Sequence, residues 1–333
     1  MIYLDHAATT PTDPAVRDAV APWLEAVPAN PSSVHAAGRA AREAVETARE
    51  QVADALGVAP LEVVFTSGGT EADNAAVLGI ARAARERGRS RLVTTAIEHP
   101  AVRDAARWLA DREGFALDVI PPAGDGVVDP DRVLDAVRPD TALVSVMAAN
   151  NEIGTVQPIE VLGPALAERG VPLHVDAVQA FSRIPLDLEG WGVSATALSA
   201  HKFHGPQGVG VLHLRRDLAC AQTSLGGGQE RGVRSGTLNT AGIVGCGVAA
   251  ALAASRREAE TPGIAGLRDR LLDALLAVDG VSVNGSLARR LPNNAHVAVA
   301  GVSGEALLLA MDAAGVAVST GSYTLSLHDA LPI

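Results

Sequence analysis

The sequence predicts an α/β fold in which helices cover both faces of a mostly parallel sheet. Strand-like apolar runs alternate with longer stretches of helical pattern, the order of elements that is typical of parallel sheets. With 333 residues the chain can bury a sizeable core, and we expect one large and one small domain. The strand-like runs are LEVVFTS, RLVTTAI, LDVIPP, TALVSVMA, PLHVDAV, SATALSA and GVGVLHL.

The last two of these runs are predicted to form a hairpin. Only HKFHGPQ joins them, and this linker is too short for a crossover helix, so the strands must pair antiparallel. Near residues 255–263 the chain becomes polar and we expect it to break at a Pro-Gly pair; a helix (LRDRLLDALLAV) and short strands (VSVNG, AHVAVA) follow. We therefore predict a large domain over residues 15–258 and an incomplete small domain over 259–322, against which residues 1–14 pack.

Composition favours a soluble enzyme and disfavours two classes of partner. The chain is 48% hydrophobic and 20% charged, as folded proteins usually are. A net charge of −11 argues against direct binding of nucleic acid. No apolar run reaches membrane-spanning length, and the start, MIYLDHAATT, has no signal-peptide pattern, so we expect a cytoplasmic protein without membrane contact.

Lys202 is the first candidate catalytic residue. It stands at the end of the strand-like run SATALSA, before a Gly/Pro loop, and between His201 and His204. A lysine in this position is well placed to form a Schiff base with a carbonyl cofactor. The apolar run PLHVDAVQ carries one acid, Asp176, which could pair with a cofactor or could form a plain ion pair with Lys202.

A second candidate feature is an anion site in VVFTSGGTEADN. A β-branched run meets Ser67-Gly68-Gly69-Thr70, and a helical pattern follows. Unpaired N–H groups and the positive end of a helix can bind a phosphate at such a turn, and Thr70 can cap the helix or donate its hydroxyl. The pattern is neither a P-loop nor GxGxxG, and on its own a Gly-Gly turn is often only a turn.

Several strand-like runs end in a polar residue. They end in or near Thr66, His99, Asn151, Asp176 and Lys202. In open α/β sheets, ligands bind at the carboxyl ends of the strands, so one cleft is predicted to hold all five side chains. A single histidine at a strand end, such as His99, is more often structural, which leaves its role open at this point.

Taken together, these motifs resemble the cysteine desulfurases. These enzymes depend on pyridoxal 5'-phosphate (PLP) and are of the class V aminotransferase type; the resemblance is strongest to the branch that serves iron–sulfur cluster assembly. It runs from YLDHAATTP at residue 3 to GVAVSTGS ending at residue 322. The motifs FTSGGTEADN, NNEIGTVQP, HVDAVQ, SAHKFHGPQGVG and GGGQERGVRSGT occur in the family's order. The resemblance implies the PLP-dependent transferase fold type I.

The resemblance also implies roles for the residues around the cofactor ring. Lys202 would hold PLP as a Schiff base and later move the substrate's α-proton. Asp176 would pair with the pyridinium nitrogen, and Gln179 would hydrogen-bond the ring hydroxyl. His99 would stack on the ring face, and Asn151 would contact the substrate or the ring substituents. Each role suits the donor, acceptor or ring that the residue offers.

The cofactor phosphate has its own implied set of residues. Within one chain, the resemblance assigns it to Gly69, Thr70, Ser199 and His201. Thr237, in RSGT, would reach the phosphate of the partner subunit's cofactor, and this implies a homodimer. The implied reaction converts L-cysteine to L-alanine and passes sulfur to an acceptor or scaffold protein for iron–sulfur cluster or thio-cofactor assembly.

The resemblance fails at the sulfur-transfer cysteine. In the family, the run AVSTGS continues with Ala-Cys, but here Ser322 is followed by Tyr323 and Thr324. Residues 323–333, YTLSLHDALPI, correspond to the in-frame translation of a common sequencing-adapter oligonucleotide, and we predict that this tail is not native. The family's C-terminal part, with an arginine for the substrate carboxylate, is missing as well.

Neither of the two cysteines is a predicted substitute. Cys246 lies in the apolar helical run AGIVGCGVAAALAAS, and Cys220 follows a strand in RRDLACAQTS, so both are interpreted as structural thiols without a metal or a disulfide. The chain as it stands is therefore expected not to transfer sulfur. Two alternatives remain: a PLP-dependent lyase or aminotransferase of the same fold, and a catalytically dead, PLP-binding partner subunit.

Overall fold

A seven-stranded sheet forms the centre of the molecule. The structure is a computed structural model that describes residues 1–25 and 29–320. The strand order is β2-β8-β7-β6-β5-β3-β4, and every neighbouring pair is parallel except that β8 runs antiparallel to β7 and β2. The predicted α/β class and hairpin are confirmed. The strands are β2 (Val63–Thr66), β3 (Arg91–Thr95), β4 (Ala116–Ile120), β5 (Thr141–Ser145), β6 (Leu173–Asp176), β7 (Ala195–Ser199) and β8 (Gly210–Leu214).

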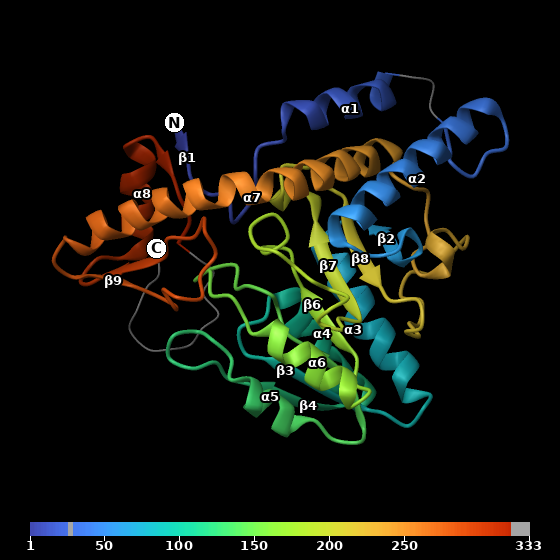
Figure 1. The fold of residues 1–333 in the computed structure, drawn as a ribbon, viewed down its shortest axis with the longest axis horizontal. Coiled ribbons are helices and arrows are strands. Elements are labelled where there is room, and N and C mark those ends of the chain that lie inside the picture. The colour runs from blue at the N-terminus through green and yellow to red at the C-terminus, as the bar shows by residue number, and fades with distance from the viewer. Residues whose placement is uncertain (26–28, 321–333) are drawn as a thin grey trace.

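Helices cover both faces of this sheet (Figure 1). One hydrophobic core joins residues of α3 and α4 to one face, and a second core joins residues of α2, α6 and α7 to the other. Alternate strand residues enter opposite cores: Val64 packs with α3, whereas Phe65 packs with α2. The helices are α1 (Pro14–Glu25), α2 (Ala36–Leu56), α3 (Gly69–Arg85), α4 (Pro100–Glu113), α5 (Pro130–Ala136), α6 (Ile159–Glu168), α7 (Thr240–Leu276) and α8 (Gly304–Ala313).

The helix break predicted near residues 255–263 is wrong, because α7 is one continuous helix of 37 residues with Pro262 inside it. A proline removes one backbone hydrogen bond, here the one to the carbonyl of Glu258, but the helical runs SRREAE before it and LRDRLLDALL after it sustain the helix. The boundary placed between residues 258 and 259 falls within α7, and the division into two domains stays a prediction.

A smaller β region lies at the far end of α7, beside α8 (Figure 1). Strand β9 (Val281–Val283) pairs antiparallel with β10 (Val297–Val299). The first strand, β1 (Ile2–Tyr3), pairs parallel with β11 (Val316–Ala317), which brings the start of the chain beside residues 316–317. None of the described helices combines the length and the apolar character that crossing a membrane requires.

Candidate active site

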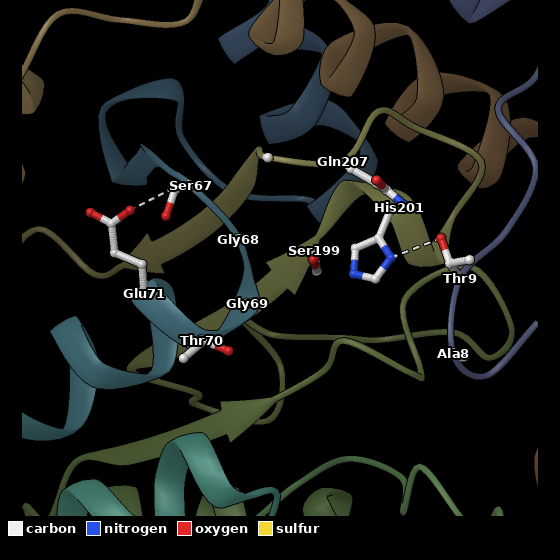
Figure 2. Close-up of a pocket in the computed structure, with 11 residues that line it drawn as sticks. Ala8, Thr9, Ser67, Gly68, Gly69, Thr70, Glu71, Ser199, His201 and Gln207 are labelled. Atoms are coloured by element: carbon white, nitrogen blue, oxygen red, sulfur yellow. Dashed lines mark hydrogen bonds between the residues drawn. The ribbon is translucent and has the colours of Figure 1, made fainter.

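A cleft of about 550 Å³ opens where β2 and β7 end and α3 begins (Figure 2). Its lining includes all four residues that the resemblance assigned to the phosphate within one chain: Gly69, Thr70, Ser199 and His201. In Figure 2 the His201 ring lies between Ser199 and the N-terminal segment at Thr9. Segments distant in sequence therefore meet at the carboxyl edge of the sheet. None of the five predicted strand-end residues is among the lining residues of this cleft in the described chain: Thr66, His99, Asn151, Asp176 and Lys202.

The turn between β2 and α3 is built for close approach. Gly68 stands at the N-cap of α3 and forms no side-chain capping bond. The first backbone N–H groups of the helix therefore remain available to a ligand in the cleft. A Cβ on Gly69 would lie 2.8 Å from Cγ2 of Val178, so no larger side chain fits. Thr66, predicted to face the cleft, is buried and donates its hydroxyl to the Gly68 carbonyl at 3.0 Å. Its role is to hold the turn.

The Lys202 amine meets the N-terminal segment. Its Nζ donates to the carbonyl oxygens of Ala7 and Ala8, the latter at 2.9 Å. The Gln179 side chain donates to the same Ala7 carbonyl at 2.9 Å, which places Gln179 and Lys202 around one atom. Sequence patterns did not predict these contacts, because a backbone carbonyl leaves no mark in the choice of side chain.

Burial and neighbouring charges act on the Lys202 amine in opposite directions. Burial lowers its pKa below the usual value, and the carboxylates of Asp5 and Asp176 oppose that shift. The net lowering raises the share of neutral, nucleophilic amine. Burial, followed by the positive charge of Lys202, also lowers the pKa of both His99 and His201. Both rings are therefore neutral at neutral pH.

Asp176 ends β6 with its side chain buried. One carboxylate oxygen accepts the N–H of Val178 at 2.9 Å, which fixes its orientation. Burial, followed by the charge of Asp73, raises the pKa of Asp176 to about 7, while Lys202 acts in the opposite direction. The carboxyl group is thus poised to accept or release a proton near neutral pH, which suits a partner of a ring nitrogen.

The remaining predicted residues lie around the cleft in different ways. His99 caps α4, where its Nδ1 accepts the N–H of Ala101 at 3.1 Å, and it interacts electrostatically with Lys202. Asn151 is half-buried in a turn and is not among the cleft-lining residues of the described chain. Its neighbour Asn150 holds that turn by accepting the N–H groups of residues 152 and 153. Thr237 is exposed outside the cleft, after Gly236.

These residues fit PLP. His201 lines the cleft, and the next residue, Lys202, offers an amine that interacts electrostatically with the buried Asp176 and with His99. Beside them, a glycine turn that tolerates no Cβ leads into an uncapped helix start that suits a phosphate. A Cβ on Gly210 of β8 would lie 2.5 Å from the carbonyl carbon of Gly68, so a second glycine is needed to keep this cradle in shape.

Comparison with known proteins gives long matches. The profile of the family described as aminotransferase class V matches residues 2–331. An "IscS-like cysteine desulfurase" of Mycobacterium tuberculosis is 48% identical over 328 residues, which are 97% of this chain and 83% of that protein. A "Cysteine desulfurase, mitochondrial" of Arabidopsis thaliana is 46% identical over 329 residues, which are 98% of this chain and 72% of that protein.

Solved structures agree with the sequence matches. A "NifS-like protein" superposes with a TM-score of 0.92 at 37% identity, covering 96% of this chain and 87% of that one. A structure described as "SspA in complex with cysteine" gives a TM-score of 0.85 at 32% identity, covering 97% of this chain and 90% of that one. The predicted fold type I is therefore confirmed, and the chain belongs to the class V aminotransferase family.

Proposed function

We propose that this protein is a PLP-dependent cysteine desulfurase, which converts L-cysteine to L-alanine and supplies sulfur for iron–sulfur cluster or thio-cofactor assembly. The observations that carry the proposal are a cleft lined by Gly69, Ser199 and His201 and, next along the chain, the Lys202 amine, which interacts electrostatically with the buried Asp176. Relatives named as cysteine desulfurases over nearly the whole chain support this substrate. The predicted cytoplasmic location stays a prediction.

Each cofactor-binding role rests on a described contact or position. Lys202 would hold the cofactor covalently, and Asp176 would bind the ring nitrogen. Gln179, beside the Lys202 amine, would hydrogen-bond the ring hydroxyl, and His99 would lie against the ring face. Asn151 would come to the substrate or the ring substituents. Gly69, Thr70, Ser199 and His201 would hold the phosphate.

The proton chemistry belongs to Lys202. When bound, PLP supplies an aldehyde for the substrate amine and a ring that takes up electrons. The lowered pKa of the Lys202 amine leaves it able to accept the α-proton of cysteine at Nζ. The carbonyl groups of Ala7 and Ala8 orient this nitrogen. Asp176 holds a proton at the ring nitrogen, where a charge-assisted hydrogen bond is strong in a dry site.

The sulfur step needs a thiolate, and we propose that this chain lacks one. The position that matches the family's cysteine, Thr324, lies outside the described residues, and so does the whole of the tail that we interpret as adapter-encoded. Burial raises the pKa of Cys220 to about 11 and that of Cys246 to about 12, so neither thiol ionises near neutral pH. A hydroxyl at Thr324 forms no persulfide.

Two partners complete the proposal. A second copy of the chain would bring Thr237, exposed on a loop here, to the phosphate of the neighbouring site. The sulfur acceptor would be a cluster-assembly scaffold or carrier protein. The molar mass of the PLP-loaded chain in solution tests the homodimer, and the mass of a single chain with full PLP occupancy would contradict it.

Incubation of the purified chain with PLP and L-cysteine tests the function. We expect borohydride to fix the cofactor on Lys202, α-proton exchange to proceed, and no persulfide to form on the protein. Lys202→Ala should lose the covalent cofactor. Replacement of residues 323–333 by the C-terminus of a relative should restore release of alanine and sulfide. Alanine release by the unmodified chain, with persulfide mapped to Cys220 or Cys246, would overturn the account of the sulfur step.

Buried cysteines and Thr324 favour one second candidate, a PLP-dependent lyase or aminotransferase that needs no enzyme thiol. That activity would appear in the same assay as a keto acid, or as loss of the substrate amino group to the cofactor, without alanine and sulfide in equal amounts. A catalytically dead, PLP-binding partner subunit would bind PLP yet exchange no α-proton, even with the restored C-terminus.

A further inference from the structure

Three ionisable side chains with no role in the proposed chemistry are buried beside Asp176. They are Asp73 on α3, Glu98 in the turn after β3, and His174 on β6, with exposed fractions of 1%, 4% and 0%. Asp73 and Glu98 each keep one buried carboxylate oxygen, Oδ1 and Oε2 respectively, without a hydrogen bond. Unpaired buried carboxylate oxygens are costly, so the protonation of this group needs an explanation.

The alternation of β6 places two of these groups against α3. Leu173 and Val175 enter the core on the opposite face, so His174 and Asp176 face the helix that carries Asp73. The Asp73 Oδ1 lies 3.4 Å from Nε2 of His174. The other ring nitrogen of His174 is 2.8 Å from the hydroxyl oxygen of Ser145 on β5. A row of polar groups thus leads from α3 through β6 to β5.

Glu98 approaches the same region from the turn that precedes His99. Its Oε1 accepts the hydroxyl of Thr95 at 2.6 Å and the N–H of Met147 at 2.9 Å, so one oxygen is fully engaged. The second oxygen, Oε2, is the unpaired one. Glu98 interacts electrostatically with both Asp176 and Asp73, which makes the three carboxyl groups one electrostatic unit.

The described chain gives this unit too little positive charge for three carboxylates. Lys202 acts on Asp176, whereas burial has the largest influence on the pKa of both Asp73 and Glu98. His174 cannot serve as one, because burial lowers its pKa to about 4. Three bare negative charges in a dry interior cost far more than the uptake of protons.

We propose that Asp73 and Glu98 carry protons at neutral pH, so that Asp176 alone presents a negative charge to the cofactor's ring nitrogen. A protonated Asp73 can donate to Nε2 of His174, whose Nδ1–H then donates to Ser145, so the two unpaired atoms of this row, Oδ1 of Asp73 and Nε2 of His174, gain a partner. Asp73 and Glu98 are thus positioning residues that act through Asp176. The statement about the ring nitrogen rests on the proposed function; the protonation itself does not.

The direction of each pKa supports this assignment. Burial raises the pKa of Asp73 well above its usual range, and it raises that of Glu98 to about 8, with the charges of Asp176 and Asp73 adding to the effect. Asp176 ionises first because the N–H of Val178 and the charge of Lys202 favour its anion. The other titratable side chains near these three carboxyl groups are His174 and His99, and burial lowers the pKa of both rings.

Infrared spectroscopy at pH 7 tests the proposal directly. A protonated carboxylic acid has a C=O band that carboxylates lack. We expect this band in the wild-type protein, with one of its two contributions lost in Asp73→Asn and the other in Glu98→Gln. Asp129→Asn is the control: the exposed N-cap of α5 accepts one N–H, as an asparagine also can, and we expect it to leave the band unchanged. Absence of the band from the wild type overturns the proposal.

The pH dependence of unfolding separates protonation from packing. Above its unfolded pKa, Glu98 is ionised in the unfolded chain but protonated in the folded one, so folding takes up a proton. Stability then falls as the pH rises toward about 8 and levels off beyond it. Glu98→Gln should make the fall between pH 5 and 8 shallower by one proton, whereas a packing defect would lower stability equally at every pH. An unchanged slope contradicts the proposal.

Both readouts are independent of catalysis. If the infrared band and the slope behave as expected but PLP does not bind, the proposed function fails and the protonation stands. If PLP binds to Lys202 and the band is missing, this inference fails and the proposed function stands. Should either variant fail to fold, the other still tests its own contribution to the band, and absence of the band from the wild type overturns the proposal.

Discussion

Two of the clusters of ionisable side chains that are buried in the described part of the chain are compensated in opposite ways. Arg49 donates through two nitrogens to the two carboxylate oxygens of Glu230, at 2.8 and 2.7 Å. Glu230 also accepts the N–H of Phe65 at 2.7 Å, and Arg49 donates to the carbonyl of Val63 at 2.8 Å. The carboxyl cluster Asp73–Glu98–Asp176 instead keeps unpaired oxygens, one on Asp73 and one on Glu98.

The comparison teaches where each arrangement belongs. The Arg49–Glu230 pair ties the loop after residue 228 to β2, and it holds Glu230 and Arg231 at positive φ of 47° and 56°, a conformation that costs about 1–3 kcal/mol per residue. Full compensation fixes structure. Where the negative charges are only partly compensated, the carboxyl groups can still gain or lose protons. This arrangement occurs around Asp176, the carboxyl group whose pKa matters for the proposed chemistry.

Breaking the compensated pair should give the largest effect. Arg49→Met leaves the Glu230 carboxylate buried without its cation and should lower the free energy of unfolding by about 3–5 kcal/mol, measured by urea denaturation at pH 7. The double variant Arg49→Met/Glu230→Leu should recover much of that loss. Arg107→Met, at an exposed pair with Asp104, serves as the control. A loss below about 1 kcal/mol for the single variant would contradict the comparison.

Asp176→Asn should have the largest effect at the uncompensated group. The amide keeps the shape but cannot hold the positive ring nitrogen, so exchange of the cysteine α-proton should fall by about 10²–10³-fold while PLP stays bound. Exchange into D₂O, followed by NMR, measures this rate. Asp187→Asn, at an exposed turn, is the matched control. Near-normal exchange in Asp176→Asn would show that another residue sets the charge of the ring.

Asp73→Asn sharpens the comparison because its expected sign is opposite to that of Arg49→Met. Burial raises the pKa of Asp73, so its carboxyl group ionises at lower pH in the unfolded chain than in the folded one. The stability of the wild type therefore falls as the pH rises, and the neutral amide of Asp73→Asn removes this contribution. We expect a free energy of unfolding within about 1 kcal/mol of the wild type at pH 6 and above it at pH 8.5. A loss as large as that of Arg49→Met at both pH values would place Asp73 among the compensated, structural charges.

The smallest effect is expected at a half-exposed pair. Arg234 donates to Glu71 at 2.8 Å, with side-chain exposures of 23% and 26%. Solvent screens this pair, so Arg234→Gln should lower the free energy of unfolding by no more than about 1 kcal/mol. Urea denaturation at low and high salt checks this prediction. The difference in free energy of unfolding between the wild type and Arg234→Gln should be smaller at high salt. A loss of stability equal to that of Arg49→Met would show that burial does not determine how much an ion pair contributes.

Much of the central fold could be predicted from the sequence, because each strand signal was local. All seven apolar runs became strands of one sheet, and the length of HKFHGPQ alone determined the antiparallel hairpin. The break at Pro262 was wrong because the propensity of the flanking helix, and packing of the helix N-terminal half, outweigh one missing hydrogen bond. Its signal was a single residue against a long helical pattern.

The site was predicted where side-chain type and strand position coincide. Lys202, Asp176 and His99 stand at or just beyond strand ends, and Lys202 interacts electrostatically with both others; their roles around a cofactor stay a prediction. Asp73 was missed because it lies on the second turn of α3, where one acid among alanines resembles a surface position until the helix face is known. Its burial is a property of packing against β6, which a single sequence does not show.

Helix α7 and the first residues of the chain are two links between the small β region and the body of the molecule. Beyond residue 250, where only Leu272 is fully buried, polar contacts tie α7 down: Arg256 pairs with Asp13 at 2.7 Å, and Arg257 and Thr261 donate to the carbonyl groups of Phe181 and Arg183. Strand β1 pairs with β11 and leads within four residues to the Ala7 carbonyl at Lys202. The opening segment is therefore a direct covalent link from the small β region to the carbonyl groups that hold the reactive amine.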